Sequence, residues 1–141
     1  MKDTLKAGLE FSSKKVIEKE KTIGFMGEDL RVYATPFMVQ DMEHSCRDFM
    51  LQHLEDGEDS VGARVEIDHL GPTLIGQTVE FSGKVVEVEG PRVLFEVEIR
   101  DEIDTVGRSK HTRFVVEKAR QGGRLEKKKA RLAEAGVKRN L

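Results

Sequence analysis

Apolar residues recur at helical spacing in one segment of this chain of 141 residues and at alternating spacing in several others. The helical segment has apolar positions at steps of three and four residues, namely Met38, Val39, Met42, Cys46, Phe49, Met50 and Leu54. Thr35-Pro36 precedes it and is a helix-start signal, because threonine can cap free amide donors and proline has no amide to leave unpaired. The acidic stretch 55–59 ends the pattern. The spacing predicts an amphipathic helix over about 36–54.

Strand patterns occupy most of the rest of the chain. Segments at about 60–69, 77–89, 92–101 and 105–117 are separated by turn signals, and we expect them to pair as an antiparallel meander. The clearest alternation puts four apolar residues on one face, Val93, Phe95, Val97 and Ile99. The short, lysine-rich segment 12–20 predicts an edge strand. Residues 21–34 have no clean period and predict a loop whose apolar residues lie against another surface, as those of a flap over a pocket do.

A sheet with one apolar face needs a cover, and the helix predicted at 36–54 is the only strongly amphipathic one available. The sequence therefore predicts an α+β fold, with one central helix wrapped by a curved antiparallel sheet of about five strands, in a domain over 1–118. Residues 119–141 are rich in lysine and arginine and poor in apolar residues. They predict a charged, solvated C-terminal helix.

Composition narrows the function classes. The 24 basic and 26 acidic residues give a net charge of -2, which provides no overall attraction to nucleic acid or to an anionic membrane. The single cysteine, Cys46, excludes an internal disulfide and a thiolate metal site, and we expect it to be inert core packing. No apolar run approaches the roughly 20 residues that span a bilayer, and the first residues lack the apolar core of a signal peptide. We therefore expect a cytoplasmic protein.

Four residues are candidates for chemistry. Glu43 shares the sheet-facing row of the predicted helix, where a carboxylate needs a partner or a water-filled pocket and could serve as a general base or nucleophile. Equally, Glu43 could lie at the edge of that row and reach solvent. His69 ends a predicted strand, where an imidazole can polarise a carbonyl or shuttle a proton, although surface histidines are common there. Thr35 could act beside an anion or only cap the helix, and Gly62, within a strand, marks a bulge or a close approach.

Two stretches then resemble the fluoroacetyl-CoA thioesterase-like family of hotdog proteins. They are Tyr33-Ala34-Thr35-Pro36-Phe37-Met38-Val39-Gln40-Asp41-Met42-Glu43-His44-Ser45-Cys46 and Ser60-Val61-Gly62-Ala63-Arg64-Val65-Glu66-Ile67-Asp68-His69. The family pattern is Ala-Thr-x-x-Met-Val-x-x-Met-Glu at a helix start, followed by a strand glycine seven residues before a histidine. Thr35, Glu43, Gly62 and His69 keep that order and spacing.

The resemblance implies a hotdog fold and an enzyme that hydrolyses a short or small acyl-CoA to the free acid and CoA. It implies Thr35, Glu43 and His69 as the catalytic set, with Glu43 as nucleophile or general base. It also implies a homodimer with two sheets joined side by side and active sites near the interface, or a tetramer of such dimers. No metal and no cofactor beyond the coenzyme A of the substrate are expected.

Substrate contacts are expected from five residues, Gly62, Phe25, Met26, Tyr33 and Phe37. The segment before Thr35 departs from that of the fluoroacetyl-specific enzyme, which predicts a different acyl group. Two alternatives share the fold. One is a non-catalytic dimer that binds an acyl-CoA or another small ligand, and the other is a dehydratase, for which the nearest helix histidine, His44, lies on the polar side.

Overall fold

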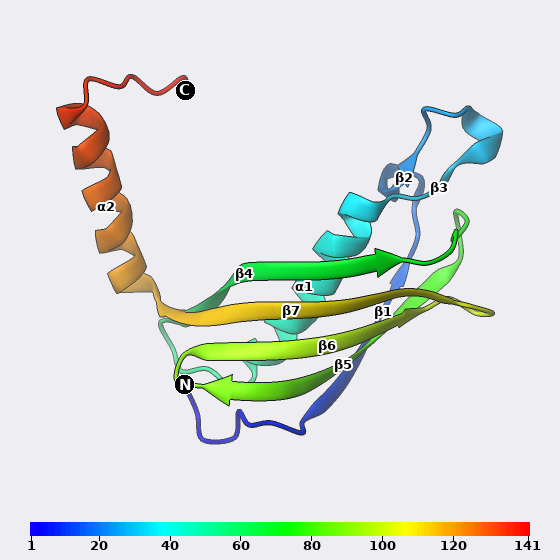
Figure 1. The fold of residues 1–141 in the computed structure, drawn as a ribbon, viewed down its shortest axis with the longest axis horizontal. Coiled ribbons are helices and arrows are strands. Elements are labelled where there is room, and N and C mark those ends of the chain that lie inside the picture. The colour runs from blue at the N-terminus through cyan, green and yellow to red at the C-terminus, as the bar shows by residue number, and fades with distance from the viewer.

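The computed structural model describes residues 1–141 as a five-stranded antiparallel sheet curved around one long helix (Figure 1). This is the hotdog arrangement expected from the sequence. Along the chain the elements are β1 (Glu10–Val16), β2 (Thr22–Ile23), β3 (Val32–Tyr33), α1 (Thr35–Leu51), β4 (Glu58–His69), β5 (Thr78–Glu89), β6 (Arg92–Arg100), β7 (Thr105–Glu117) and α2 (Lys118–Glu134).

The strand order is β1-β5-β6-β7-β4, so the predicted meander is only partly correct. β5, β6 and β7 follow one another as expected, but β4 pairs with β7 and leaves β5 on the other side of the sheet. The connection between β4 and β5, residues 70–77, is longer than the tight turns that join neighbouring hairpin strands. It crosses to the far side instead, and β1 and β4 become the two edges.

The first turn of α1 differs from the prediction in a way that matters for the site. Ala34 holds the N-cap position and makes no side-chain cap, and the helix begins at Thr35 and ends at Leu51. The prediction that Thr35 caps the helix is therefore wrong. Because Thr35 is already helical, its hydroxyl is available to a partner outside the helix.

The core lies between α1 and the inner face of the sheet, where 17 buried apolar residues form one cluster. Met38, Met42, Cys46 and Met50 of α1 are fully buried there. Burial raises the pKa of the Cys46 thiol to about 12, as expected for inert packing. At the β1 edge, the Phe11 ring stacks on Phe49 with centroids 4.4 Å apart.

A short hairpin segment, residues 19–33, precedes α1 and includes β2 and β3. Its base is fastened to α1 through Asp41, which is 1% exposed. Lys21 Nζ lies 2.5 Å from Asp41 Oδ1, and the Tyr33 hydroxyl donates to Asp41 Oδ2 at 2.5 Å. A buried carboxylate with both a cation and a hydroxyl donor holds the hairpin segment at a fixed angle to the helix.

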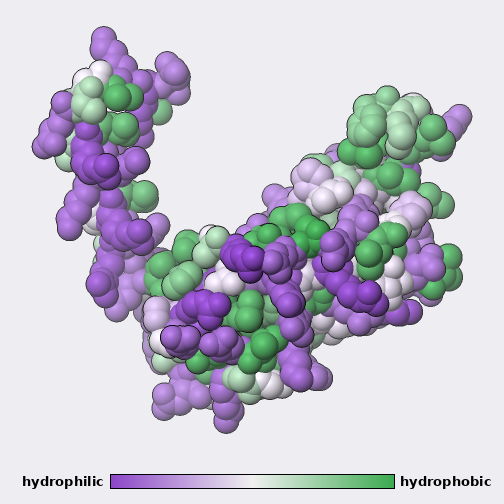
Figure 2. Space-filling model, viewed as in Figure 1, coloured by the Kyte–Doolittle hydropathy of each residue, from purple (hydrophilic) through white to green (hydrophobic).

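The tip of the hairpin segment projects from the body as an apolar cluster, seen at the upper right of Figure 2. Phe25 is 80% exposed and Met26 is 53% exposed. The expectation that these side chains lie against another surface is therefore wrong within one chain. The reason is that the hairpin segment runs past the end of the sheet that could have covered it.

At the other end of the molecule, α2 leaves β7 and extends past the β4 edge in the view of Figure 1. None of its residues is buried, as predicted for a charged, solvated helix. No helix in the structure has both the length and the apolar character needed to cross a membrane.

Replacing Asp41 tests how the hairpin segment is held. We expect Asp41→Ala to lower the free energy of unfolding by about 3 kcal/mol, because Lys21 and Tyr33 lose their shared buried partner. Asp48→Ala, on the exposed face of the same helix, is the matched control and should change stability little. Chemical denaturation of both variants makes the comparison, and equal stabilities would contradict the proposed fastening role.

Candidate functional site

Thr35 and His69 form the first half of the site. Thr35 Oγ1 lies 2.7 Å from His69 Nδ1, which joins the first turn of α1 to the last residue of β4. Burial lowers the pKa of His69 below its ordinary value of 6.5, with a backbone hydrogen bond to Gly71 opposing the shift. The imidazole is therefore neutral near pH 7, the form that can accept or relay a proton.

Glu43 and Gly62 form the second half. Glu43 lies at the margin of the buried face of α1 with its side chain 32% exposed, so it is directed at the sheet and still reaches solvent. A Cβ atom on Gly62 would lie 2.5 Å from Glu43 Oε2, so any larger residue here would force the Glu43 carboxylate to move. The strand register also shifts between Gly62 and Arg64. The predicted bulge at Gly62 is confirmed, and the group that lies close to this glycine is the Glu43 side chain.

A buried cation faces the Glu43 carboxylate. Arg113 is 4% exposed, and its Nη1 lies 3.5 Å from Glu43 Oε2. Its guanidinium also donates to Ser60 Oγ and to the Ser60 carbonyl, both at 2.8 Å. Because Arg113 is fixed by Ser60 of β4, the position of its charge beside Glu43 is fixed as well.

His111 completes this polar cluster as a neutral group. Its Nδ1 lies 2.8 Å from the Arg64 carbonyl oxygen and must donate to it, so Nε2 is left to accept from Arg113 Nη1 at 3.1 Å. Burial lowers the pKa of His111, which agrees with this tautomer. The 3.7 Å separation of His111 Nε2 from Glu43 Oε2 is therefore not an ion pair, and Arg113 is the cation that faces Glu43.

Neither His111 nor Arg113 was among the residues predicted from the sequence. On β7 the inward-facing positions are polar, because Ser109, His111 and Arg113 alternate at two-residue steps, so apolar alternation does not mark this face. The sequence feature that could have identified Arg113 as a site residue is its position within a strand. An arginine on the inner face of a strand needs a partner on the helix side, and the carboxylate of α1 that meets Arg113 is Glu43.

The two halves lie apart within one chain. Thr35 and Glu43 are eight residues apart on α1, which corresponds to about 12 Å along a helix. Gly62 and His69 are seven residues apart on β4, or about 23 Å along a strand. The fold thus gathers Thr35 with His69 and Glu43 with Gly62, but it does not bring Thr35, Glu43 and His69 together in a single subunit.

The residues expected to contact substrate divide into two groups. Phe37, on the first turn of α1, is 36% exposed, and Phe25 and Met26 are exposed at the hairpin tip. Tyr33 is 1% exposed, and burial together with its hydrogen bond to Asp41 raises its pKa. Its ring packs edge-on to His69 with centroids 6.4 Å apart, so Tyr33 supports His69 from the core and offers no surface to a ligand.

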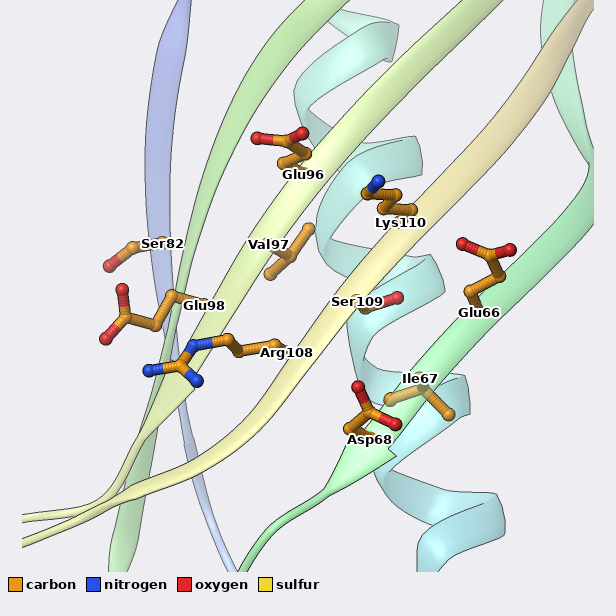
Figure 3. A pocket seen from close by; sticks show the side chains of 10 residues that line it. All are labelled: Glu66, Ile67, Asp68, Ser82, Glu96, Val97, Glu98, Arg108, Ser109 and Lys110. Atoms are coloured by element: carbon orange, nitrogen blue, oxygen red, sulfur yellow. The ribbon is translucent and has the colours of Figure 1, made fainter.

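A surface hollow of about 840 Å³ lies elsewhere, on the face of the sheet opposite α1 (Figure 3). Its side chains stand in front of the strands while α1 lies behind them. Arg108 is paired in register with Asp68 and Glu98, and Lys110 with Glu66 and Glu96. Four carboxylates around two cations disfavour an anionic ligand, and this hollow holds none of Thr35, Glu43 and His69.

Comparison with known proteins agrees with the fold. Residues 17–119 match the family described as fluoroacetyl-CoA-specific thioesterase. The fluoroacetyl-CoA thioesterase of Streptantibioticus cattleyicolor is 33% identical over 123 residues, which are 82% of this chain and 88% of that protein.

Two solved structures show the same similarity in three dimensions. A thioesterase superfamily member from Thermus thermophilus has a TM-score of 0.82 at 32% identity, covering 91% of this chain and 96% of that chain. A mutant fluoroacetyl-CoA-specific thioesterase in complex with fluoroacetate and CoA has a TM-score of 0.74 at 32% identity, covering 80% of this chain and 96% of that chain. The chain therefore belongs to the fluoroacetyl-CoA-specific thioesterase family.

Proposed function

We propose that this protein is an acyl-CoA thioesterase that hydrolyses a short or small acyl-CoA to the free acid and CoA. The observation that carries the proposal is the hydrogen bond between Thr35 and His69, at the positions that match the family pattern. A neutral imidazole oriented by a hydroxyl can donate a hydrogen bond to a thioester carbonyl, or take a proton from the attacking water and pass it to the departing thiolate. The solved structure of a relative in complex with fluoroacetate and CoA supports an acyl-CoA as the substrate class.

In this proposal Glu43 acts as the nucleophile or the general base. Its carboxylate either attacks the thioester carbonyl, forming an anhydride that water then hydrolyses, or removes a proton from the water that attacks directly. Both routes consume one water, break the carbon–sulfur bond and leave a carboxylic acid and the CoA thiol. Arg113 holds the carboxylate in place, and the Glu43 side chain lies directly against Gly62.

The separation of the two halves leads us to propose that each site is shared between two subunits. β4 is a 12-residue edge strand with unpaired backbone groups, and Val61 on it is 40% exposed. Long free edges of this kind favour pairing with another strand. Antiparallel pairing of two β4 strands about a two-fold axis would extend the sheet across a dimer.

The register of that pairing follows from the site residues. A two-fold axis at Glu66 opposes residues that lie on the same face of the sheet, such as Val65 and Ile67. Because the bulge between Gly62 and Arg64 adds one residue, this axis brings each Gly62 opposite His69 of the partner subunit. Glu43 of one protomer then meets the other half of the site from its partner. In this arrangement the exposed Phe25 and Met26 would pack against the partner subunit. Together with Phe37 they would line the space for the acyl group.

Release of CoA thiol from short, branched, aromatic and halogenated acyl-CoAs tests the activity. We expect turnover of at least one substrate, and a loss of roughly 100-fold or more in Glu43→Gln and in His69→Ala, because each removes a group that acts on the reacting atoms. His44→Ala is the matched control, since His44 is exposed and next to Glu43 on α1. Binding of acyl-CoA without any hydrolysis would instead identify a non-catalytic ligand-binding protein.

Substitution of Gly62 tests the close approach. Gly62→Ala should lower kcat by roughly tenfold or more, because the new methyl group displaces the Glu43 carboxylate from its position. Gly71→Ala is the control, because a Cβ atom there meets nothing within 4 Å. Circular dichroism checks that both variants fold, and wild-type kcat in Gly62→Ala would show that Glu43 does not depend on this contact.

Mixed dimers test whether the site is shared. A heterodimer of a Glu43→Gln chain and a His69→Ala chain, purified by two different tags, has one intact shared site and should recover about half of the wild-type activity. Each homodimer has none. Activity as low as that of the homodimers would mean that Glu43 and His69 act within one subunit. A heterodimer of wild-type and Glu43→Gln chains controls for tagging and exchange.

A further inference from the structure

A row of four cations follows one side of α2. Arg120, Arg124, Lys127 and Arg131 stand at steps of four, three and four residues, which places them within about 60° around the helix axis. We call this row the α2 basic stripe. None of its members forms an ion pair, and the pair on this helix, Lys129 with Glu126, lies on another side. Unpaired like charges at this spacing destabilise a helix slightly, and a polyanionic ligand would relieve the repulsion.

The stripe begins at a hollow of about 520 Å³ at the root of α2. Arg120 and Arg124 line it together with Pro91 and Val115, which supply an apolar surface. The side-chain oxygen of Gln121, also in this lining, is buried without a hydrogen-bond partner. Cations beside an apolar surface and an unused polar group suit a nucleotide, with its phosphates and flat base.

The carboxylates near this hollow do not oppose an anion strongly. Glu58 is engaged by the terminal amine of Met1 and by the Glu55 amide, which lowers its pKa. Glu117, at the start of α2, is exposed to solvent. Arg120 and Arg124 therefore make this hollow favourable for an anionic ligand.

The position of the hollow relates it to the proposed reaction site. Glu58, in its lining, is four residues from Gly62 on β4, or about 13 Å along the strand. In acyl-CoA the pantetheine arm separates the thioester from the phosphates by a similar reach. α2 also extends past the β4 edge, on the side where the second sheet would join (Figure 1).

We propose that the α2 basic stripe and the hollow at its root bind the 3′-phosphate and diphosphate groups of the acyl-CoA whose thioester is cleaved beside Glu43 of the same subunit, an inference that rests on the proposed function. The stripe, from Arg120 onward, lies outside residues 17–119, which match the family. It would bind the nucleotide end of the substrate independently of the acyl group.

Two full-length double variants test the proposal. Arg120→Gln/Arg124→Gln removes two charges from the stripe, whereas Lys118→Gln/Lys129→Gln removes two from the opposite side of α2. Since no residue of α2 is buried, both variants should fold, which circular dichroism verifies. Calorimetry measures the Kd for CoA. Turnover is compared between an acyl-CoA and the matching acyl-pantetheine, which lacks the nucleotide phosphates.

The stripe variant should weaken CoA binding and raise KM for acyl-CoA by about tenfold, because charge-assisted contacts to phosphate are lost. Its kcat, and its kcat/KM for acyl-pantetheine, should stay at wild-type values, and the control variant should change by less than about twofold. Added salt should raise the wild-type KM for acyl-CoA and affect the stripe variant less.

Three results would overturn the proposal: unchanged CoA affinity in the stripe variant, equal weakening in both variants, or loss of oligonucleotide binding with CoA affinity retained, which would make the stripe a nucleic-acid site. A different result separates this proposal from the proposed function. If the wild type hydrolyses no thioester but binds CoA, and only the stripe variant weakens that binding, the enzyme assignment fails while the phosphate site stands.

Discussion

The structure depends on burial of one face of α1 against the inner face of the sheet. No other helix packs on the sheet, since α2 has no buried residue, so the apolar surface of the central strands has only α1 to cover it. This burial is the main favourable term for a domain of this size. It also sets how closely the helix approaches β4 and β7, and the contacts of Thr35 with His69 and of Glu43 with Arg113 are made across that interface.

Close packing at this interface explains why polar residues occur within it. Gly62 lets the Glu43 side chain lie directly against β4, and the guanidinium of Arg113 provides the opposite charge from the next strand. A buried cation of this kind is costly unless its donors are used, and Ser60 and His111 accept from Arg113 on the remaining sides. The carboxylate is thus held in a fixed position with access to solvent.

The lengths of α1 and β4 separate the candidate site residues into two groups. Thr35 and His69 are at one end of the α1–β4 pair, and Glu43 and Gly62 are farther along both elements. A free β4 edge, an apolar hairpin tip and a basic helix that passes the edge are all features that a single subunit leaves unpartnered. A two-fold axis across β4 would account for them together. In that case the catalytic arrangement would depend on the oligomeric state, because each site would contain residues of both subunits.

The sequence by itself determined the local structure and the residues worth testing. The spacing of apolar residues identified α1 and the long strands to within a few residues. The reason is that the buried face of a helix repeats about every 3.6 residues and that of a strand every second residue. The family was indicated by a resemblance, in which Thr35, Glu43, Gly62 and His69 keep the order and spacing of the family pattern. Only the tertiary structure decided that β4 pairs with β7, that Thr35 bonds to His69 instead of capping α1, and that Arg113 and His111 accompany Glu43. These are contacts between residues far apart in the chain, and they depend on which elements become neighbours, which periodicity along one element does not encode.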